Sequence, residues 1–198
     1  MTESPRQLSN LDASFQINAS ELKKSAMRIE EHFKDIQPDF LVFTGKSSLI
    51  SRAICRQSEV MKSSSWVWFD HSLNHALTML GGDDYDERAD KILKQNYPQL
   101  TPGSNVMIID EFSETGLKAN YYVRTLNRLG FQKVNFAVFT ASSHHRYIPS
   151  FFAGSYDEEL RVLMKNVSGT VSNAVSDHAI TRAKPVLRKI NAVLSGRL

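Results

Sequence analysis

The sequence contains very little cysteine. Cys55 is its only cysteine, so no disulfide can form within the chain. Six prolines and nine glycines are too few for a collagen-like or low-complexity chain. No apolar run reaches the roughly 18 to 20 residues that a membrane-spanning helix needs, and the first ten residues lack the basic end and apolar stretch of a secretory signal. We therefore expect a folded cytoplasmic protein that does not engage a membrane.

The length of 198 residues, with 41% hydrophobic side chains, is enough for one core of ordinary size. The net charge is +3, but the five charged residues in 178–198 are all basic, which leaves −2 on the rest of the chain. These five are Arg182, Lys184, Arg188, Lys189 and Arg197. A solvated helix face is the plainer interpretation of this basic segment, and contact with nucleic acid through it stays open.

The ends of the chain differ in pattern from its middle. The first 17 residues are polar without a clear period, which favours an arm, and a stripe at helical spacing from Leu22 to Ile36 then predicts a helix. Near the end, Pro185 precedes an apolar stripe that predicts a helix docked on the body or on a second subunit of a homodimer. The expected units are an arm at 1–17, an α/β domain at 18–176 and a basic C-terminal helix at 177–198.

Short apolar runs alternate with helical stripes through the middle of the chain. Strands are predicted at 39–44, 64–69, 105–109 and 133–139. The stretch 70–102 mixes helix and turn signals and is read as a lid, an insertion or a helix over one sheet edge. Because parallel strands need crossover connections, the alternation predicts an α/β fold: a mostly parallel twisted sheet with helices on both faces.

The clearest candidate site begins at Asp110 and Glu111, directly after the third predicted strand. Ligands of such sheets bind at the carboxyl ends of the strands, and two carboxylates there can accept hydrogen bonds from hydroxyls or hold a cation. The turn that follows leads through Thr115 and Gly116 into a helix, whose first N–H groups favour a phosphate. The pattern suits a sugar that carries a phosphate at one end.

The segment Val106–Gly116 resembles the phosphoribosyl pyrophosphate motif of type I phosphoribosyltransferases, which has four apolar residues, two acids, an apolar residue, two variable residues, Thr or Ser, and Gly. The resemblance implies transfer of a phosphoribosyl group from phosphoribosyl pyrophosphate to a nitrogenous base, with Mg²⁺ neutralising the leaving pyrophosphate. It implies that Asp110 and Glu111 hold the ribose hydroxyls and the metal. The residues implied to cradle the 5′-phosphate are Phe112, Ser113, Glu114, Thr115 and Gly116, and Glu114 is the candidate catalytic group for proton transfer.

An earlier loop completes the resemblance. In the family, a loop after the first core strand contacts pyrophosphate, and here Thr44, Gly45, Lys46, Ser47 and Ser48 stand in that place. Lys46 offers a positive charge, and the serines offer hydroxyl and N–H groups for a diphosphate. The resemblance then spans residues 40 to 139, about half of the chain.

Two positions depart from the family pattern. Lys118 stands where Thr is frequent, and it could reach the phosphate from the first helical turn; Ser48 stands where glycine is common. The mobile loop that closes over the site in the family has no recognisable counterpart in 70–102. A second hypothesis is therefore a non-catalytic regulator that senses a phosphoribosyl compound or a nucleotide, with the basic C-terminal helix available for nucleic acid.

Other patterns point to rival chemistry. Gly45-Lys46-Ser47 matches the end of a P-loop, but the opening glycine of that motif would fall on Phe40, inside a predicted strand. His71 and His75 have the spacing of a metal-binding pair, but no third ligand motif accompanies them, so surface or lid histidines are the favoured interpretation. Residues interpreted as an exposed loop or as core, with ligand contact as the alternative, are His144, His145, Arg146, Tyr147, Phe151, Phe152 and Tyr156. Cys55 has no visible activator, and no chemistry is assigned to it.

Overall fold

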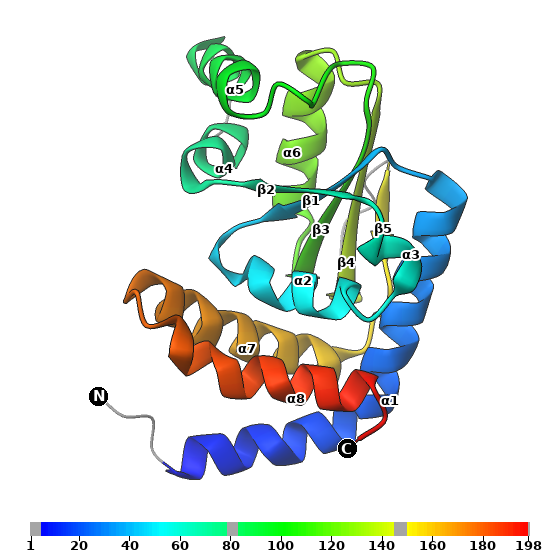
Figure 1. Ribbon diagram of the computed structural model, residues 1–198, viewed down its shortest axis with the longest axis vertical. Helices are drawn as coiled ribbons and strands as arrows, with labels where there is room; N and C mark the ends of the chain where they lie inside the picture. The colour runs from blue at the N-terminus through cyan, green and yellow to red at the C-terminus, as the bar shows by residue number, and fades with distance from the viewer. Residues whose placement is uncertain (1–4, 79–82, 145–149, 198) are drawn as a thin grey trace.

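The protein has three layers, with one parallel sheet between two layers of helices (Figure 1). The computed structural model describes residues 5–78, 83–144 and 150–197. The sheet order is β2-β1-β3-β4-β5, and every pairing is parallel. The strands are β1 (Phe40–Thr44), β2 (Ser65–Phe69), β3 (Asn105–Ser113), β4 (Lys133–Ala141) and β5 (Phe151–Ala153). The predicted α/β fold class is confirmed.

The register of β1 and β3 positions the candidate site. Phe43 lies opposite Ile109 in the parallel pairing of these strands. Because both strands run in the same direction, Thr44 and Asp110 come next on neighbouring strands at the carboxyl edge of the sheet. The loops that the sequence analysis singled out therefore emerge side by side.

One face of the sheet is covered by four helices that share a hydrophobic core. These helices are α1 (Pro5–Ile36), α2 (Leu49–Cys55), α7 (Glu158–Ser176) and α8 (Lys184–Leu194). In α8, Val186, Ile190 and Val193 are buried, as the apolar stripe predicted for a helix docked on the body. The short helices α3 (Glu59–Lys62), η1 (Lys46–Ser48) and η2 (Ile180–Ala183) connect these elements.

Helix α1 begins earlier than the sequence period indicated. It already starts at Pro5, so most of the segment interpreted as an arm is helical. Phe15 in this segment is buried in the same core as Leu22 and Ile29. Figure 1 shows the first part of α1 lying alongside α8 and its second part rising beside the sheet. Of the side chains described in 13–17, Phe15 is the buried one, and a single buried position is too little to show a helical period in the sequence.

The opposite face is covered by α4 (His71–Thr78), α5 (Asp83–Asn96) and α6 (Leu117–Arg128). In the described part of 70–102, α4 and α5 both pack on this face of the sheet, whereas the sequence left open a lid, an insertion or a helix over one sheet edge. Asp70 Oδ1 accepts a hydrogen bond of 2.8 Å from the amide of Leu73 and so caps the start of α4. In the described part of the chain, no helix combines the length and apolarity needed to cross a bilayer.

Candidate functional site

Strand β3 extends further than its apolar run predicted, and this decides how the two acids point. The strand continues through Asp110 and Glu111 to Ser113. Successive side chains of a strand point to opposite faces, so Asp110 faces the α6 layer with Ile108, and Glu111 faces the α2 and α7 layer with Ile109. The acids are adjacent in sequence but have different neighbours.

Asp110 forms an ion pair within its own motif. Its Oδ2 lies 2.6 Å from Lys118 Nζ, and its Oδ1 accepts a hydrogen bond of 3.0 Å from the amide of Glu111. Burial lowers the pKa of Lys118, but the charge of Asp110, its hydrogen bond with Lys118 and the nearby Tyr122 and Glu111 together raise the pKa above its ordinary value. The Lys118 side chain remains 40% exposed, whereas that of Asp110 is 8% exposed. The lysine that departs from the family pattern is therefore charged and directed at the first acid of the motif.

Glu111 is fully buried among serine hydroxyl groups. Ser47 donates to its Oε2 at 2.7 Å, Ser51 donates to its Oε1 at 2.6 Å, and Ser168 lies 3.5 Å from Oε2. Burial, and then the charge of Asp110, raise the pKa of Glu111 to about 8, while the hydrogen bonds from Ser51 and Ser47 lower it in part. These contacts tie β3 to η1, α2 and α7.

The turn after β3 enters α6 through a glycine in the left-handed region. Gly116 has a φ of 78°, in the left-handed region that glycine adopts without strain, and it precedes the first residue of α6. Gly116 has no side chain to cap α6, but Thr115 Oγ1 accepts a hydrogen bond of 3.4 Å from the amide of Leu117, the first residue of the helix. Ser113 Oγ accepts a hydrogen bond of 3.1 Å from the amide of Gly116 and stabilises the turn. The positive end of α6 therefore faces the space above β3.

Glu114, in the same turn, is held by two cations of α7. Its Oε1 lies 2.7 Å from Lys165 Nζ and 2.9 Å from a guanidinium nitrogen of Arg161. The hydrogen bond from Lys165, followed by the charges of Lys165 and Arg161, lowers the pKa of Glu114. The carboxylate is thus ionised at neutral pH, the form in which a group can accept a proton. Its predicted catalytic role stays a prediction.

The first loop reaches the same part of the molecule. Gly45 has a φ of 78°, and a Cβ at this position would lie 3.9 Å from Lys118 Nζ, which places the lysine beside the loop backbone. Lys46 donates a hydrogen bond of 2.9 Å to Ser176 Oγ at the end of α7. Thr44 and Ser48 are buried beneath the loop, so their side chains do not reach its surface.

Two cavities of similar size meet at the carboxyl edge of the sheet. The first, of about 540 Å³, is lined by Ser47, by the segment 110–118 and by Lys165, Ser168, Gly169 and Ser172 of α7. We call it the motif cavity. The second, of about 550 Å³, is lined by Gly45, Lys46, His71, Asn74, His75, Thr78, Lys118, Tyr121, Tyr122 and Ser172, and we call it the α4 cavity. Lys118 and Ser172 line both, so the two spaces adjoin.

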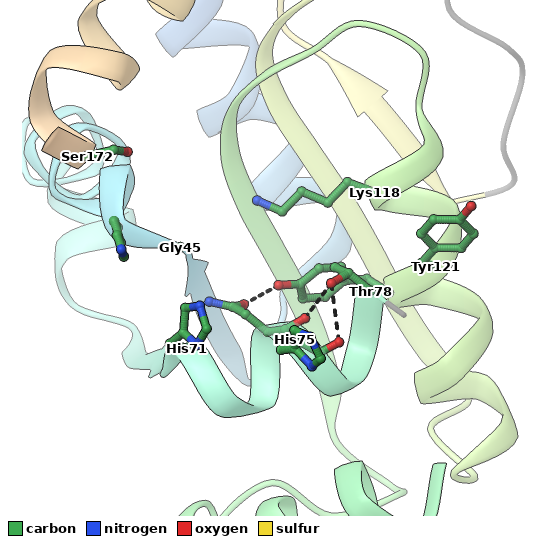
Figure 2. A pocket seen from close by; sticks show the side chains of 10 residues that line it. Gly45, His71, His75, Thr78, Lys118, Tyr121 and Ser172 are labelled. Carbon is green, nitrogen blue, oxygen red and sulfur yellow. Dashed lines mark hydrogen bonds between the residues drawn. The ribbon is translucent and has the colours of Figure 1, made fainter. Parts of the chain in front are cut away.

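Figure 2 shows the α4 cavity from close by. Lys118 extends from α6 toward Gly45 and Ser172, and His71 and His75 project from α4 on the opposite side. Inside the wall, the Tyr122 hydroxyl donates to Asn74 Oδ1, and Asn74 Nδ2 donates to the carbonyl oxygen of Phe69 at 3.1 Å. These hydrogen bonds fix the side of the cavity that α4 and α6 form.

Sequence reasoning missed the contribution of α7. Its cavity-facing residues recur at helical spacing as Lys165, Ser168, Gly169 and Ser172, followed by Ser176. This small and polar stripe lies opposite the apolar stripe of Leu163, Met164, Val167 and Val171. The helical period was therefore visible in the sequence, but Lys165 follows Glu114 of the motif by 51 residues, and only the fold brings the two together.

Other candidates lie away from both cavities or outside the described residues. Phe151 and Phe152 form edge strand β5, where Phe152 stacks on His32 with ring centroids 4.0 Å apart, and Tyr156 is exposed. His144 is exposed, while His145, Arg146 and Tyr147 lie outside the described residues. Cys55 is buried, and burial raises the pKa of its thiol. Where the structure describes the chain, no three His, Cys, Asp or Glu side chains gather as a metal site.

The acids of the motif do not fit a Mg²⁺ ion held by the protein itself. Lys118 already neutralises Asp110 at 2.6 Å, and burial raises the pKa of Glu111, which disfavours its ionised form. Mg²⁺ prefers ionised oxygen ligands in octahedral geometry. A Mg²⁺ ion that accompanies the diphosphate of a ligand stays a prediction.

Comparisons with known proteins give distant structural likenesses. A purine phosphoribosyltransferase from Pyrococcus horikoshii Ot3 matches at a TM-score of 0.42 and 12% identity, covering 67% of this chain and 80% of that one. A phosphoheptose isomerase from Francisella tularensis matches at a TM-score of 0.44 and 11% identity, covering 96% of this chain and 99% of that one. No family model and no curated protein matches the chain. Neither likeness assigns a function, so the functional argument rests on the residues of this chain.

Proposed function

We propose that the protein binds phosphoribosyl pyrophosphate in the two adjoining cavities and transfers its phosphoribosyl group to a nitrogenous base, with release of pyrophosphate. One contact supports this most directly: Ser47 of the first loop donates a hydrogen bond of 2.7 Å to Glu111 of the motif. Two loops implied by the resemblance to bind opposite ends of one ligand are thereby joined, although 64 residues separate these partners.

Each part of the ligand has a complementary surface. The 5′-phosphate would occupy the motif cavity at the start of α6, where helix amides and Lys165 favour an anion. The ribose would lie over the end of β3 beside Asp110. The diphosphate would extend toward Gly45 and Lys46, with Lys118 between the cavities. An ammonium group has three N–H donors, so Lys118 can contact the diphosphate while it still donates to Asp110.

The proposed reaction breaks the bond between the anomeric carbon and a pyrophosphate oxygen and forms a bond from that carbon to a nitrogen of the base. Positive charge develops on the ribose ring, and a nearby ionised carboxylate stabilises it. We assign this role to Asp110, which lines the motif cavity at the end of β3 and pairs with Lys118. Glu114 is assigned as acceptor of the proton that the nitrogen loses, because it is ionised and lines the motif cavity, although Lys165 and Arg161 weaken it as a base by lowering its pKa.

A second candidate is the non-catalytic regulator, and the Lys118–Asp110 ion pair favours it. An acid that is neutralised by its own lysine supplies less stabilisation to a cationic transition state than a free acid. Binding of a phosphoribosyl compound would persist in such a protein, whereas transfer would be lost.

Pyrophosphate release separates the candidates. The protein is incubated with phosphoribosyl pyrophosphate, Mg²⁺ and each of a panel of purine, pyrimidine and pyridine bases. Release that depends on one base supports transfer, and calorimetric binding without release supports the regulator. Asp110→Asn should weaken the affinity for phosphoribosyl pyrophosphate at least tenfold, because it removes the charged partner of the ribose and of Lys118. Unchanged affinity in this variant would overturn the assignment of the site.

A further inference from the structure

The α4 cavity has a charge pattern that the sequence motif did not reveal. The ionisable residues that can carry positive charge on its wall are Lys46, Lys118, His71 and His75. None of the described lining residues is acidic. Asp110 faces Lys118 from the motif cavity, so the α4 cavity has a rim of two ammonium groups and two imidazole groups from η1, α4 and α6.

The two histidines are arranged to act together. They lie one turn apart on α4, with ring centroids 6.4 Å apart and ring planes inclined by 24°. Leu73 and Ala76 on the other side of α4 are fully buried against the sheet, so the helix cannot rotate its histidines away from the cavity without exposing that face. Imidazole groups spaced in this way can donate N–H hydrogen bonds to neighbouring oxygen atoms of one polyanion.

Lys118 connects the α4 cavity with the motif cavity. Its ammonium group is shared by the two cavities and lies beside the backbone of Gly45. An anion that contacts Lys118 from the α4 side therefore lies within reach of both the histidines and the first loop. A single phosphate would span only part of a cavity of about 550 Å³, so a chain of two phosphates fits the arrangement better.

We propose that His71 and His75 of α4 are binding residues for a diphosphate group, and that with Lys46 and Lys118 they form its subsite in the α4 cavity. This inference rests on the proposed function, because the diphosphate it places is that of phosphoribosyl pyrophosphate. It assigns a role to two histidines that the sequence pattern had favoured as surface or lid residues. The α4 helix then acts as a wall of the binding site as well as a cover for the sheet.

The test uses inorganic diphosphate as the probe, with calorimetry on the full chain at pH 6.0 and low salt. His71→Asn and His75→Asn should each weaken diphosphate affinity about tenfold, the effect of losing one charge-assisted hydrogen bond. His→Asn changes helix propensity little. His178→Asn is the matched control, since His178 is exposed, does not line the cavity and has a φ of 54° that asparagine tolerates. His75→Arg should restore affinity, because arginine returns a cationic donor at the same place.

Each outcome bears on the inference separately from the proposed function. Diphosphate binding that both Asn variants retain, with unchanged thermal unfolding, overturns the role of the histidines even where phosphoribosyl pyrophosphate still binds. Weakened binding in both variants, with His178→Asn unaffected, supports the subsite even where no base supports transfer. Failure of the wild-type chain to bind diphosphate overturns the inference, while ribose 5-phosphate binding in the same chain would still support the motif cavity.

Discussion

Lys118 Nζ lies 2.6 Å from Asp110 Oδ2, which joins the residue that departs from the phosphoribosyltransferase pattern to the first acid of the motif. The two side chains come from α6 and β3, eight residues apart, with the turn around Gly116 between them. The pair lies at the boundary between the motif cavity and the α4 cavity.

Lys118→Met should lower the free energy of unfolding by about 1–2 kcal/mol, because Asp110 is left buried without its cation. This is less than the loss expected for a fully buried pair, since Lys118 is 40% exposed and water screens the charge. Urea unfolding at pH 7 measures the change. Lys94→Met is the matched control, since Lys94 pairs with Asp90 at the same distance on an exposed helix face, and we expect a loss of at most about 0.5 kcal/mol. Equal losses in the two variants would contradict a special role for the Lys118 pair.

Glu111→Gln should change how stability depends on pH. The pKa of Glu111 in the folded protein is raised to about 8 from an ordinary value of 4.5, so the folded state holds a proton that the unfolded state releases. The contribution of this group to stability is full below pH 4.5 and is lost as pH rises toward 8. The unfolding free energy of the wild type, compared with that of Glu111→Gln, should therefore fall steadily between pH 5 and pH 8. Parallel curves for the two proteins would show that Glu111 is ionised in the fold.

Glu114→Gln tests the predicted proton acceptor. If Glu114 accepts the proton of the attacking nitrogen, base-dependent pyrophosphate release should slow about 100-fold while the affinity for phosphoribosyl pyrophosphate changes little. Glu158→Gln is a suitable control, because Glu158 also pairs with Arg161 but does not line the motif cavity. An unchanged rate in Glu114→Gln would show that Glu114 is not the proton acceptor and only attaches the turn to α7.

Gly169 offers a way to fill the motif cavity without disturbing the core. A Cβ at this position of α7 would meet nothing within 4 Å. Gly169→Ala should stabilise the protein by about 0.5–1 kcal/mol, because alanine loses less conformational entropy in a helix. Gly169→Leu should keep that gain in part and weaken ribose 5-phosphate binding at least tenfold, since its side chain projects into the cavity. Calorimetry with ribose 5-phosphate and thermal unfolding measure the two effects, and undiminished binding by the leucine variant would place the ligand elsewhere.

The sequence predicted the fold better than the orientation of the site. Apolar runs placed four of the five strands, and strand-helix alternation predicted the parallel sheet. Strand β5 was not predicted, because three residues at a sheet edge carry too short a pattern. The strand character of Asp110 and Glu111 was also missed, since an apolar run marks where a strand is buried and β3 continues beyond it.

The sequence alone determined two features of the site. It set the order of residues in the motif from Val106 to Gly116, and it put a glycine where the backbone takes a positive φ before α6. Tertiary structure decided which groups meet that motif. Strand alternation sends Asp110 toward Lys118 and Glu111 toward the serines, while packing of the apolar faces of α7 and α4 against the sheet brings Lys165 and His71 to the same edge. These contacts form because apolar faces of segments far apart in the chain are buried together, and no local sequence pattern specifies them.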